Sequence, residues 1–209
     1  MIKRVRNIKN KVNNLKTICN DLIELILDKK ISKQKLTGVY HTEFEKFGAM
    51  PVQSTDYPII KDILKVLKLN GTEKILDVGC GLGRFLGYLS IKGHTGNLLG
   101  VEIDKTYATF CSFVFKNKKQ IKIIHGNALE IPLPQDYIAY LYNPFNEKML
   151  DRFLNQNNFP IIIYSNDIYR KVFDKHNNYK LFLRIKSRLN DGTLVHVSFY
   201  KSISNTTGQ

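Results

Sequence analysis

Three glycines and a carboxylate farther along the chain have the types and spacing that point most directly to chemistry. Gly79, Gly81 and Gly83 follow the apolar segment 75–78, and Glu102 ends a second apolar segment nineteen residues after Gly83. Glycine tolerates positive φ and has no Cβ, so a ligand can approach the turning backbone closely. A carboxylate at the end of the next strand can accept hydrogen bonds from both hydroxyls of a ribose. The pattern predicts a site for a nucleotide-like cofactor.

Two nearby side chains narrow the kind of cofactor. The dinucleotide fingerprint G-x-G-x-x-G requires a third glycine at position 84, where this chain has Arg84. Asp77 would repel a pyrophosphate at the strand end but attract an ammonium group. S-adenosylmethionine combines a ribose, an ammonium and a sulfonium without a phosphate. An ordinary tight strand-to-helix turn, or a related fold that holds another nucleotide, are the alternative interpretations.

The segments Asp-Val-Gly-Cys-Gly-Leu-Gly at 77–83 and Gly-Val-Glu-Ile-Asp at 100–104 resemble the first two motifs of the class I, Rossmann-like S-adenosylmethionine-dependent methyltransferases. The resemblance covers about residues 54 to 200. It implies that Asp77 attracts the amino-acid end of the cofactor and that Glu102 holds its ribose. Asn127 stands where the family commonly has an acid that reads the adenine, although an Asn chosen for a turn explains it equally well. The implied cofactor site comprises Asp77, Gly79, Cys80, Gly81, Gly83, Glu102, Ile103, Asn127 and Ala128.

A second motif lies after the fourth predicted strand. Asn143, Pro144 and Phe145 resemble, incompletely, the Asn-Pro-Pro-aromatic motif with which some methyltransferases hold an amine, because the second proline is absent. The resemblance extends to a set of small bacterial class I methyltransferases. It implies that the Asn oxygen accepts a hydrogen from the target nitrogen while the aromatic ring stacks on the acceptor. The alternative is a strand end where Pro stops the ladder and Phe packs.

The elements that must position these residues follow from the apolar pattern. Strands are predicted near 74–78, 97–102, 121–125, 137–142, 160–165, 180–189 and 193–201, with helices near 56–69, 84–92, 105–117, 147–156 and 167–176. Alternating strands and helices predict a parallel sheet with right-handed crossovers. Asp191-Gly192 favours a tight hairpin between the last two strands. The fold class is therefore α/β: a Rossmann-like, seven-stranded, mostly parallel sheet with a C-terminal antiparallel hairpin.

The N-terminal segment has a separate pattern. An apolar heptad stripe predicts an amphipathic helix in a segment, residues 1–36, that holds ten Lys or Arg and three acids. The simplest interpretation packs the stripe on the domain or on a second copy. A membrane surface, a nucleic acid and an acidic partner are alternatives. The stripe consists of Val5, Ile8, Val12, Leu15, Cys19, Leu22 and Ile26.

The chain divides into three predicted parts. Residues 1–53 form the basic helix and a connector that folds over the site, residues 54–203 form the methyltransferase domain, and residues 204–209 form a polar tail. Three widely spaced cysteines predict a reducing compartment and no metal site. The sequence has no membrane-length apolar run and no signal-peptide pattern, so we expect a cytoplasmic protein.

The predicted function is transfer of a methyl group from S-adenosylmethionine to an amine nitrogen of a protein or small molecule, by in-line displacement. The net charge of +14 keeps RNA or DNA methylation as an alternative, although no nucleic-acid-binding module is recognisable. A cofactor-binding scaffold without catalysis is the other alternative. In it the N-terminal helix makes a homodimer or a peripheral membrane contact.

Overall fold

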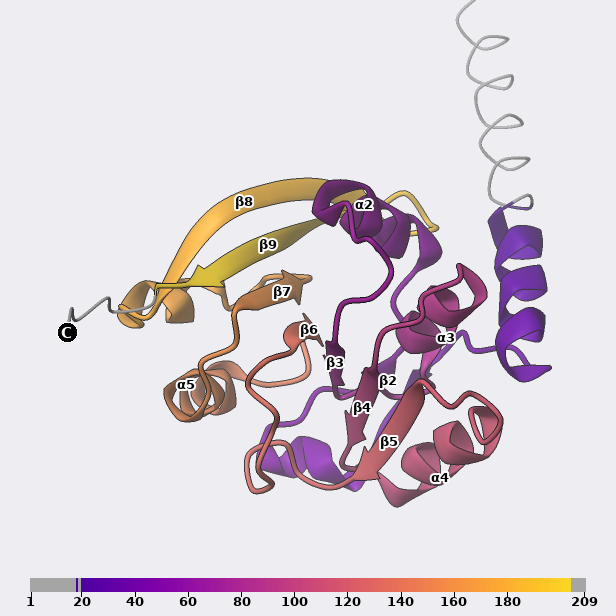
Figure 1. Ribbon diagram of the computed structural model, residues 1–209, viewed down its shortest axis with the longest axis horizontal. Helices are drawn as coiled ribbons and strands as arrows, with labels where there is room; N and C mark the ends of the chain where they lie inside the picture. Colours follow the sequence, from indigo (N-terminus) through magenta and orange to yellow (C-terminus); the bar gives the residue numbers. More distant parts are fainter. Residues whose placement is uncertain (1–17, 19, 204–209) are drawn as a thin grey trace, which may run out of the picture.

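A single seven-stranded sheet organises the computed structural model, which describes residues 18 and 20–203. Its strand order is β5-β4-β3-β6-β7-β9-β8 (Figure 1). The first five strands in that order run parallel, whereas β9 is antiparallel to β7 and to β8. This arrangement confirms the predicted fold class. The strands are β3 (Ile75–Val78), β4 (Leu98–Glu102), β5 (Ile121–His125), β6 (Ile138–Tyr142), β7 (Ile161–Ser165), β8 (Tyr179–Arg188) and β9 (Leu194–Ser202).

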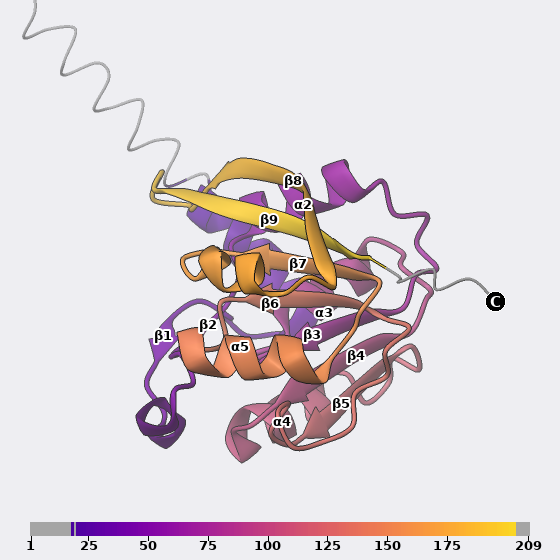
Figure 2. The same cartoon turned by 90° about the vertical axis from the view of Figure 1, so that its left-hand side faces the viewer.

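Helices cover both faces of the sheet because successive strand residues point to opposite sides. Leu76 and Val78 face a core shared with α5 (Glu147–Gln156) and η2 (Arg170–Lys175). Ile75, one residue away, faces the other core, which three further helices build (Figures 1 and 2). Those helices are α2 (Tyr57–Leu67), α3 (Arg84–Ile91) and α4 (Lys105–Val114). The glycine loop therefore joins the central strand β3 to a helix that is packed on the sheet.

One of the predicted helices needs correction, whereas the helix start predicted at residue 56 agrees with α2. The predicted helix at 167–176 is only the 3-10 helix η2, because the buried Asp167 carboxylate accepts hydrogen bonds from Arg184 and Ser198 of the hairpin and caps no helix. Asp56 stands at the N-cap position of α2, but its carboxylate accepts from the Asn190 amide at 2.8 Å. Both acids tie the C-terminal hairpin to the body instead of stabilising a helix end.

The connector before α2 is partly ordered into short elements. β1 (Val39–Tyr40) pairs with β2 (Val52–Gln53), and the 3-10 helix η1 (Glu43–Phe47) lies between them. Backbone hydrogen bonds join this connector to the loop after β6: the Met50 amide donates to the Pro144 carbonyl at 3.1 Å, and the Asn146 amide donates to the Gly48 carbonyl at 2.8 Å. The connector is thereby fastened beside the carboxyl ends of the parallel strands.

The chain before the connector is anchored through charge. Residues 20–32 are helical, and Glu24 and Asp28 of this helix meet the guanidinium of Arg84, the first residue of α3. Arg84 Nη1 lies 2.5 Å from Glu24 Oε1, and Nη2 lies 2.9 Å from Asp28 Oδ2. The Arg84 side chain is 1% exposed. The Tyr57 ring lies 4.9 Å from the guanidinium carbon, and its hydroxyl donates to Asp28 Oδ1.

The two described residues of the apolar stripe, Leu22 and Ile26, do not pack on the domain, so packing on the domain is wrong for this part of the stripe. Leu22 and Ile26 are 57% and 47% exposed, whereas Glu24 and Asp28 are buried. A charge pair decides the orientation, because the buried Arg84 requires anionic partners. The remaining stripe positions, Val5, Ile8, Val12, Leu15 and Cys19, lie outside the described residues. Within the part of the chain that the structure describes, no helix has the length and apolar character to cross a membrane.

Arg84→Met is expected to lower the free energy of unfolding by about 3–5 kcal/mol, because it leaves Glu24 and Asp28 buried without a cation. Urea unfolding followed by circular dichroism measures the loss. The matched control is Arg188→Met, since Arg188 is exposed on β8. A loss below about 1 kcal/mol, typical of a surface ion pair, would contradict the anchoring role.

Candidate functional site

The glycine loop leaves no room for side chains where it turns. Gly79, Gly81 and Gly83 have φ values of 73°, 51° and 74°, in the left-handed region that favours glycine. A Cβ on Gly79 would lie 3.0 Å from the Pro144 side chain, and one on Gly81 would lie 2.9 Å from Val52. Gly83 instead backs onto Cys111 and Phe115 of the core. The first two glycines thus form a narrow cradle between the loop after β6 and the connector.

The Glu102 carboxylate is held in place by two backbone amides. Gly81 N donates to Oε2 at 2.8 Å, and Asp104 N donates to Oε1 at 2.9 Å. Glu102 is buried, and burial raises the pKa of its carboxyl in spite of these hydrogen bonds. Each oxygen keeps a further lone pair for a donor. The side chain therefore presents a fixed pair of acceptors, the arrangement that two ribose hydroxyls require.

Asp77 lies beneath this loop, at the end of β3. Its side chain is buried, and burial together with the nearby Glu102 carboxylate raises the pKa of Asp77 well above its ordinary value. Cys80 is also buried, and its sulfur would lie 2.8 Å from a Cβ on Gly100 of β4. The Cys80 thiol thus points toward the sheet. Cys111 of α4 donates from its thiol to the Gly81 carbonyl at 3.1 Å.

A cavity of about 660 Å³, including its open mouth, lies at the carboxyl ends of the central strands. It brings together eight of the predicted site residues: Gly79, Glu102, Ile103, Asn127, Ala128, Asn143, Pro144 and Phe145. Four others, Asp77, Cys80, Gly81 and Gly83, support the loop without lining the cavity. Sequence reasoning missed the lining residues Thr42, Ala49, Met50, Pro51, Val52, Gln53, Val101, Gly126, Tyr142 and Met149.

Most of the missed residues belong to the connector, which the sequence placed over the site only in general terms. Ala49 forms an isolated antiparallel bridge with Phe145, and this bridge brings residues 49–53 to the cavity wall. The connector has no periodicity that could identify which of its residues face inward. Gly48, with φ of 99°, and the following Pro51 were the available signals of a turn in this segment.

The predicted adenine-reading Asn127 has local hydrogen-bond partners. Its Oδ1 accepts from the Leu129 amide at 3.0 Å, and its Nδ2 donates to Glu130 at 2.9 Å. The first bond is an Asx turn, which corresponds to the turn interpretation of this residue. Asn127 and Ala128 both line the cavity on the side of β5.

Asn143 is buried and has a φ of 46°. The hydroxyl of Tyr164, on the neighbouring strand β7, donates to Asn143 Oδ1 at 2.8 Å. Phe145 is also buried, and its ring centroid lies 5.3 Å from that of Phe153 of α5. The motif is therefore tied into the core on one side while it lines the cavity on the other.

These residues fit S-adenosylmethionine. The glycine cradle admits a ligand close to the backbone, and the oriented Glu102 carboxylate suits a ribose diol. Burial raises the pKa of both the Asp77 and the Glu102 carboxyl, so a bound cation would stabilise their ionised forms. The cofactor's ammonium and sulfonium supply such charge.

Comparison with known proteins agrees with this geometry. Residues 75–178 match the family model described as "Methyltransferase domain". The demethylmenaquinone methyltransferase of Bacillus licheniformis is 30% identical over 115 residues, which cover 52% of this chain and 49% of that protein. The chain thus spans about half the length of this curated relative. The matched residues are thus similar to a methyltransferase domain, and S-adenosylmethionine is the methyl donor of that class of enzyme.

Solved structures show the same fold at low identity. The O-methyltransferase from Bacillus cereus in complex with SAH superposes with a TM-score of 0.56 at 11% identity, over 71% of this chain and 83% of that one. The tRNA (uracil-54, C5)-methyltransferase of Pyrococcus abyssi, in complex with S-adenosyl-L-homocysteine, superposes with a TM-score of 0.54 at 18% identity. The match covers 70% of this chain and 38% of that one. Because these similar folds methylate different acceptors, the acceptor must be argued from the site.

Asp77→Asn is expected to raise the melting temperature of the ligand-free protein near neutral pH. The raised pKa means that the folded state resists ionisation, so Asp77 costs stability above the ordinary aspartate pKa of 3.8, and the cost grows as pH rises. A neutral amide removes that cost, at about 2–4 °C for each kcal/mol recovered. Thermal melting across a pH series measures the effect. Asp136→Asn is the control, because Lys74 lowers the pKa of the exposed Asp136; a fall in melting temperature for Asp77→Asn would contradict the account.

Proposed function

We propose that this protein transfers a methyl group from S-adenosylmethionine to an amine nitrogen of a small molecule or a protein side chain. The observation that carries the proposal is the Asn143 amide, which lines the cavity while Tyr164 holds its oxygen from behind. The bound cofactor supplies an activated methyl group on a sulfonium, so the protein's task is chiefly positioning.

The residues of the chain divide that task. Gly79, which lines the cavity, lets the donor lie against the backbone, and Glu102 accepts from its ribose. Asp77 lies beneath the loop, where the ammonium of the amino-acid end would stabilise its ionised form. Ile103 and Ala128 contribute the walls of an adenine site, with Asn127 at its edge.

The acceptor side rests on the hydrogen-bonding capacity of Asn143. An amide oxygen has two lone pairs, and Tyr164 uses one of them. The second can accept a hydrogen from an amine, which turns the nitrogen lone pair toward the methyl group. The Pro144 carbonyl is a second acceptor for the amine beside Asn143. It already accepts a hydrogen bond from the Met50 amide at 3.1 Å. Phe145 packs on Phe153 and so supports the loop.

The connector favours a small or extended acceptor. Residues 49–53 line the same cavity as Asn143 and are bonded to the loop at 144–146. An amine on a small molecule or on a flexible side chain can enter such a partly covered site. A base held in a folded RNA would require the connector to move away.

Glu102→Gln is expected to weaken binding of S-adenosylhomocysteine by roughly ten- to hundredfold. The glutamine side chain has one acceptor oxygen, whereas two backbone amides and two ribose hydroxyls donate to the glutamate. A hydrogen bond to a charged group contributes about 1.5–3 kcal/mol. Titration calorimetry measures the affinity, with Glu147→Gln on the surface of α5 as the control. Unchanged affinity in Glu102→Gln, or no binding by the unaltered protein, would refute the donor assignment.

Asn143→Gly is expected to lower turnover by at least about a hundredfold while affinity for S-adenosylhomocysteine stays within a few-fold. Glycine keeps the positive φ of this position, so the variant removes the amide without backbone strain. Asn166→Gly, at a φ of 52°, is a control with the same backbone demand. Tyr164→Phe should give a smaller loss, since it frees the amide without removing it.

The assay is transfer of a tritiated methyl group into lysate separated into protein, nucleic-acid and small-molecule fractions. The proposal expects label in the protein or small-molecule fraction, in a linkage that resists base as N-methyl groups do. Label confined to RNA, or released by mild base as from a methyl ester, would overturn the amine acceptor.

A further inference from the structure

The helix at residues 20–32 presents an apolar stripe to solvent. The exposed side of this helix carries Leu22 and Ile26 of the stripe, together with Ile23 and with Ile18, four residues before Leu22. These four side chains are 57%, 47%, 47% and 62% exposed. Scattered apolar side chains are normal on protein surfaces, but four on one side of one helix form a patch that marks an interaction surface.

This orientation is fixed, because the opposite face of the helix is locked to the body. Arg84 holds Glu24 and Asp28 there, and Asp28 Oδ2 also accepts from the Leu36 amide at 2.8 Å. Below them, Ile31 packs so closely on α3 that a Cβ on Gly87 would lie 2.3 Å from its side chain. The helix cannot roll to bury its stripe without exposing a buried ion pair.

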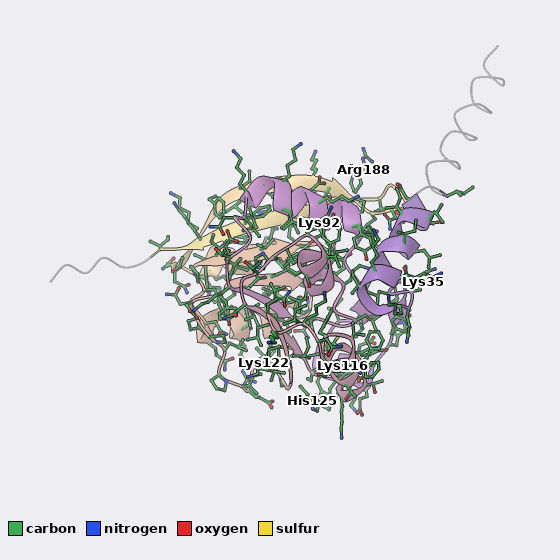
Figure 3. The ribbon with its side chains drawn as sticks, turned by 45° about the vertical axis from the view of Figure 1, so that its right-hand side comes forward. Lys35, Lys92, Lys116, Lys122, His125 and Arg188 are labelled. Atoms are coloured by element: carbon green, nitrogen blue, oxygen red, sulfur yellow. The ribbon has the colours of Figure 1, made fainter. Side chains whose placement is uncertain are left out.

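The same ion pair changes the charge that the N-terminal segment offers to a partner. Residues 1–36 contain ten Lys or Arg and three acids, and Arg84 engages two of those acids. Asp21 is the one acid of this segment that Arg84 does not engage. Lys29, Lys30, Lys33 and Lys35 are exposed; Figure 3 shows Lys35 beside this helix. An apolar stripe accompanied by cations suits an anionic surface with an apolar interior.

Charge also argues against a second copy of this chain as the occupant. In the heptad register of Leu22 and Ile26, the next seam position holds Lys29 and the position beside it holds Lys30, both exposed. A parallel pair of identical helices would bring these like charges together across the seam. A nucleic acid would match the cations but would leave the exposed isoleucines and Leu22 in water.

We propose that this face docks the protein on an anionic phospholipid bilayer. The side chains of Leu22 and Ile26 enter the boundary between headgroups and acyl chains, and the lysines lie among the phosphates. The catalytic domain is then held at the membrane surface through Arg84. The helix lies in the plane of the surface and does not cross the bilayer.

Flotation of the full chain with lipid vesicles tests this docking. The protein is expected to float with vesicles of mixed phosphatidylcholine and phosphatidylglycerol and to remain behind with vesicles of phosphatidylcholine alone. The variant Leu22→Gln/Ile26→Gln should reduce the floating fraction at least about tenfold, because it removes the inserted side chains. Both residues are exposed, so melting temperature and S-adenosylhomocysteine affinity should not change.

A matched control is Leu181→Gln, an apolar residue 41% exposed near the start of β8, on the side of the molecule away from this helix (Figure 1). It should float like the unaltered protein. Equal flotation of Leu22→Gln/Ile26→Gln, or no flotation with anionic vesicles, would overturn the proposal. A dimer in analytical ultracentrifugation that this double variant abolishes would assign the stripe to a second copy instead, and also overturn it.

Discussion

The buried ion pair of Arg84 with Glu24 and Asp28 is the constraint on which the covered site depends. Arg84 is the first residue after the glycine loop, so its backbone position is set by that loop. Its guanidinium also donates to the Thr37 hydroxyl, at the beginning of the connector. The other end of the connector region is bonded to the loop at 144–146. The segment that lines the cavity is thus fixed between a charge pair and a backbone bridge.

This dependence explains which parts of the fold the sequence could predict. The strands and the glycine turn are local patterns: apolar runs, positive-φ glycines and an Asp-Gly hairpin each specify their own conformation. The orientation of the N-terminal helix is not local. Apolar periodicity alone places the stripe of Leu22 and Ile26 inward, but the requirement of Arg84 for partners about sixty residues earlier overrides it. The predicted helix at 167–176 is wrong for the same reason. Arg184, on the hairpin, donates a hydrogen bond to the Asp167 carboxylate, which therefore does not cap a helix.

The candidate site divides in a similar way. Spacing was sufficient to place Gly79 and Glu102 at one cavity, because strand order in a parallel sheet brings their loops together. It could not predict that Tyr164 donates to Asn143, or that the Asn127 oxygen closes a turn on Leu129. These partners depend on side-chain directions across two strands or within one loop. Residue type alone therefore identified the polar groups of the site, while the structure determined how much hydrogen-bonding capacity each has left for a ligand.

The two carboxylates of the site are linked to ligand charge by the same energetics that govern Arg84. The buried Arg84 is paired with two acids of the chain itself, whereas burial raises the pKa of both Asp77 and Glu102, and the Glu102 carboxylate raises that of Asp77 further. Burial of like charges is tolerated where a bound ligand supplies the opposite charge. A cationic ligand such as S-adenosylmethionine would gain, as binding affinity, the stability that these buried carboxyls cost the ligand-free protein. The neutral thioether left after methyl transfer would satisfy the site less well, which favours release of the product over the donor.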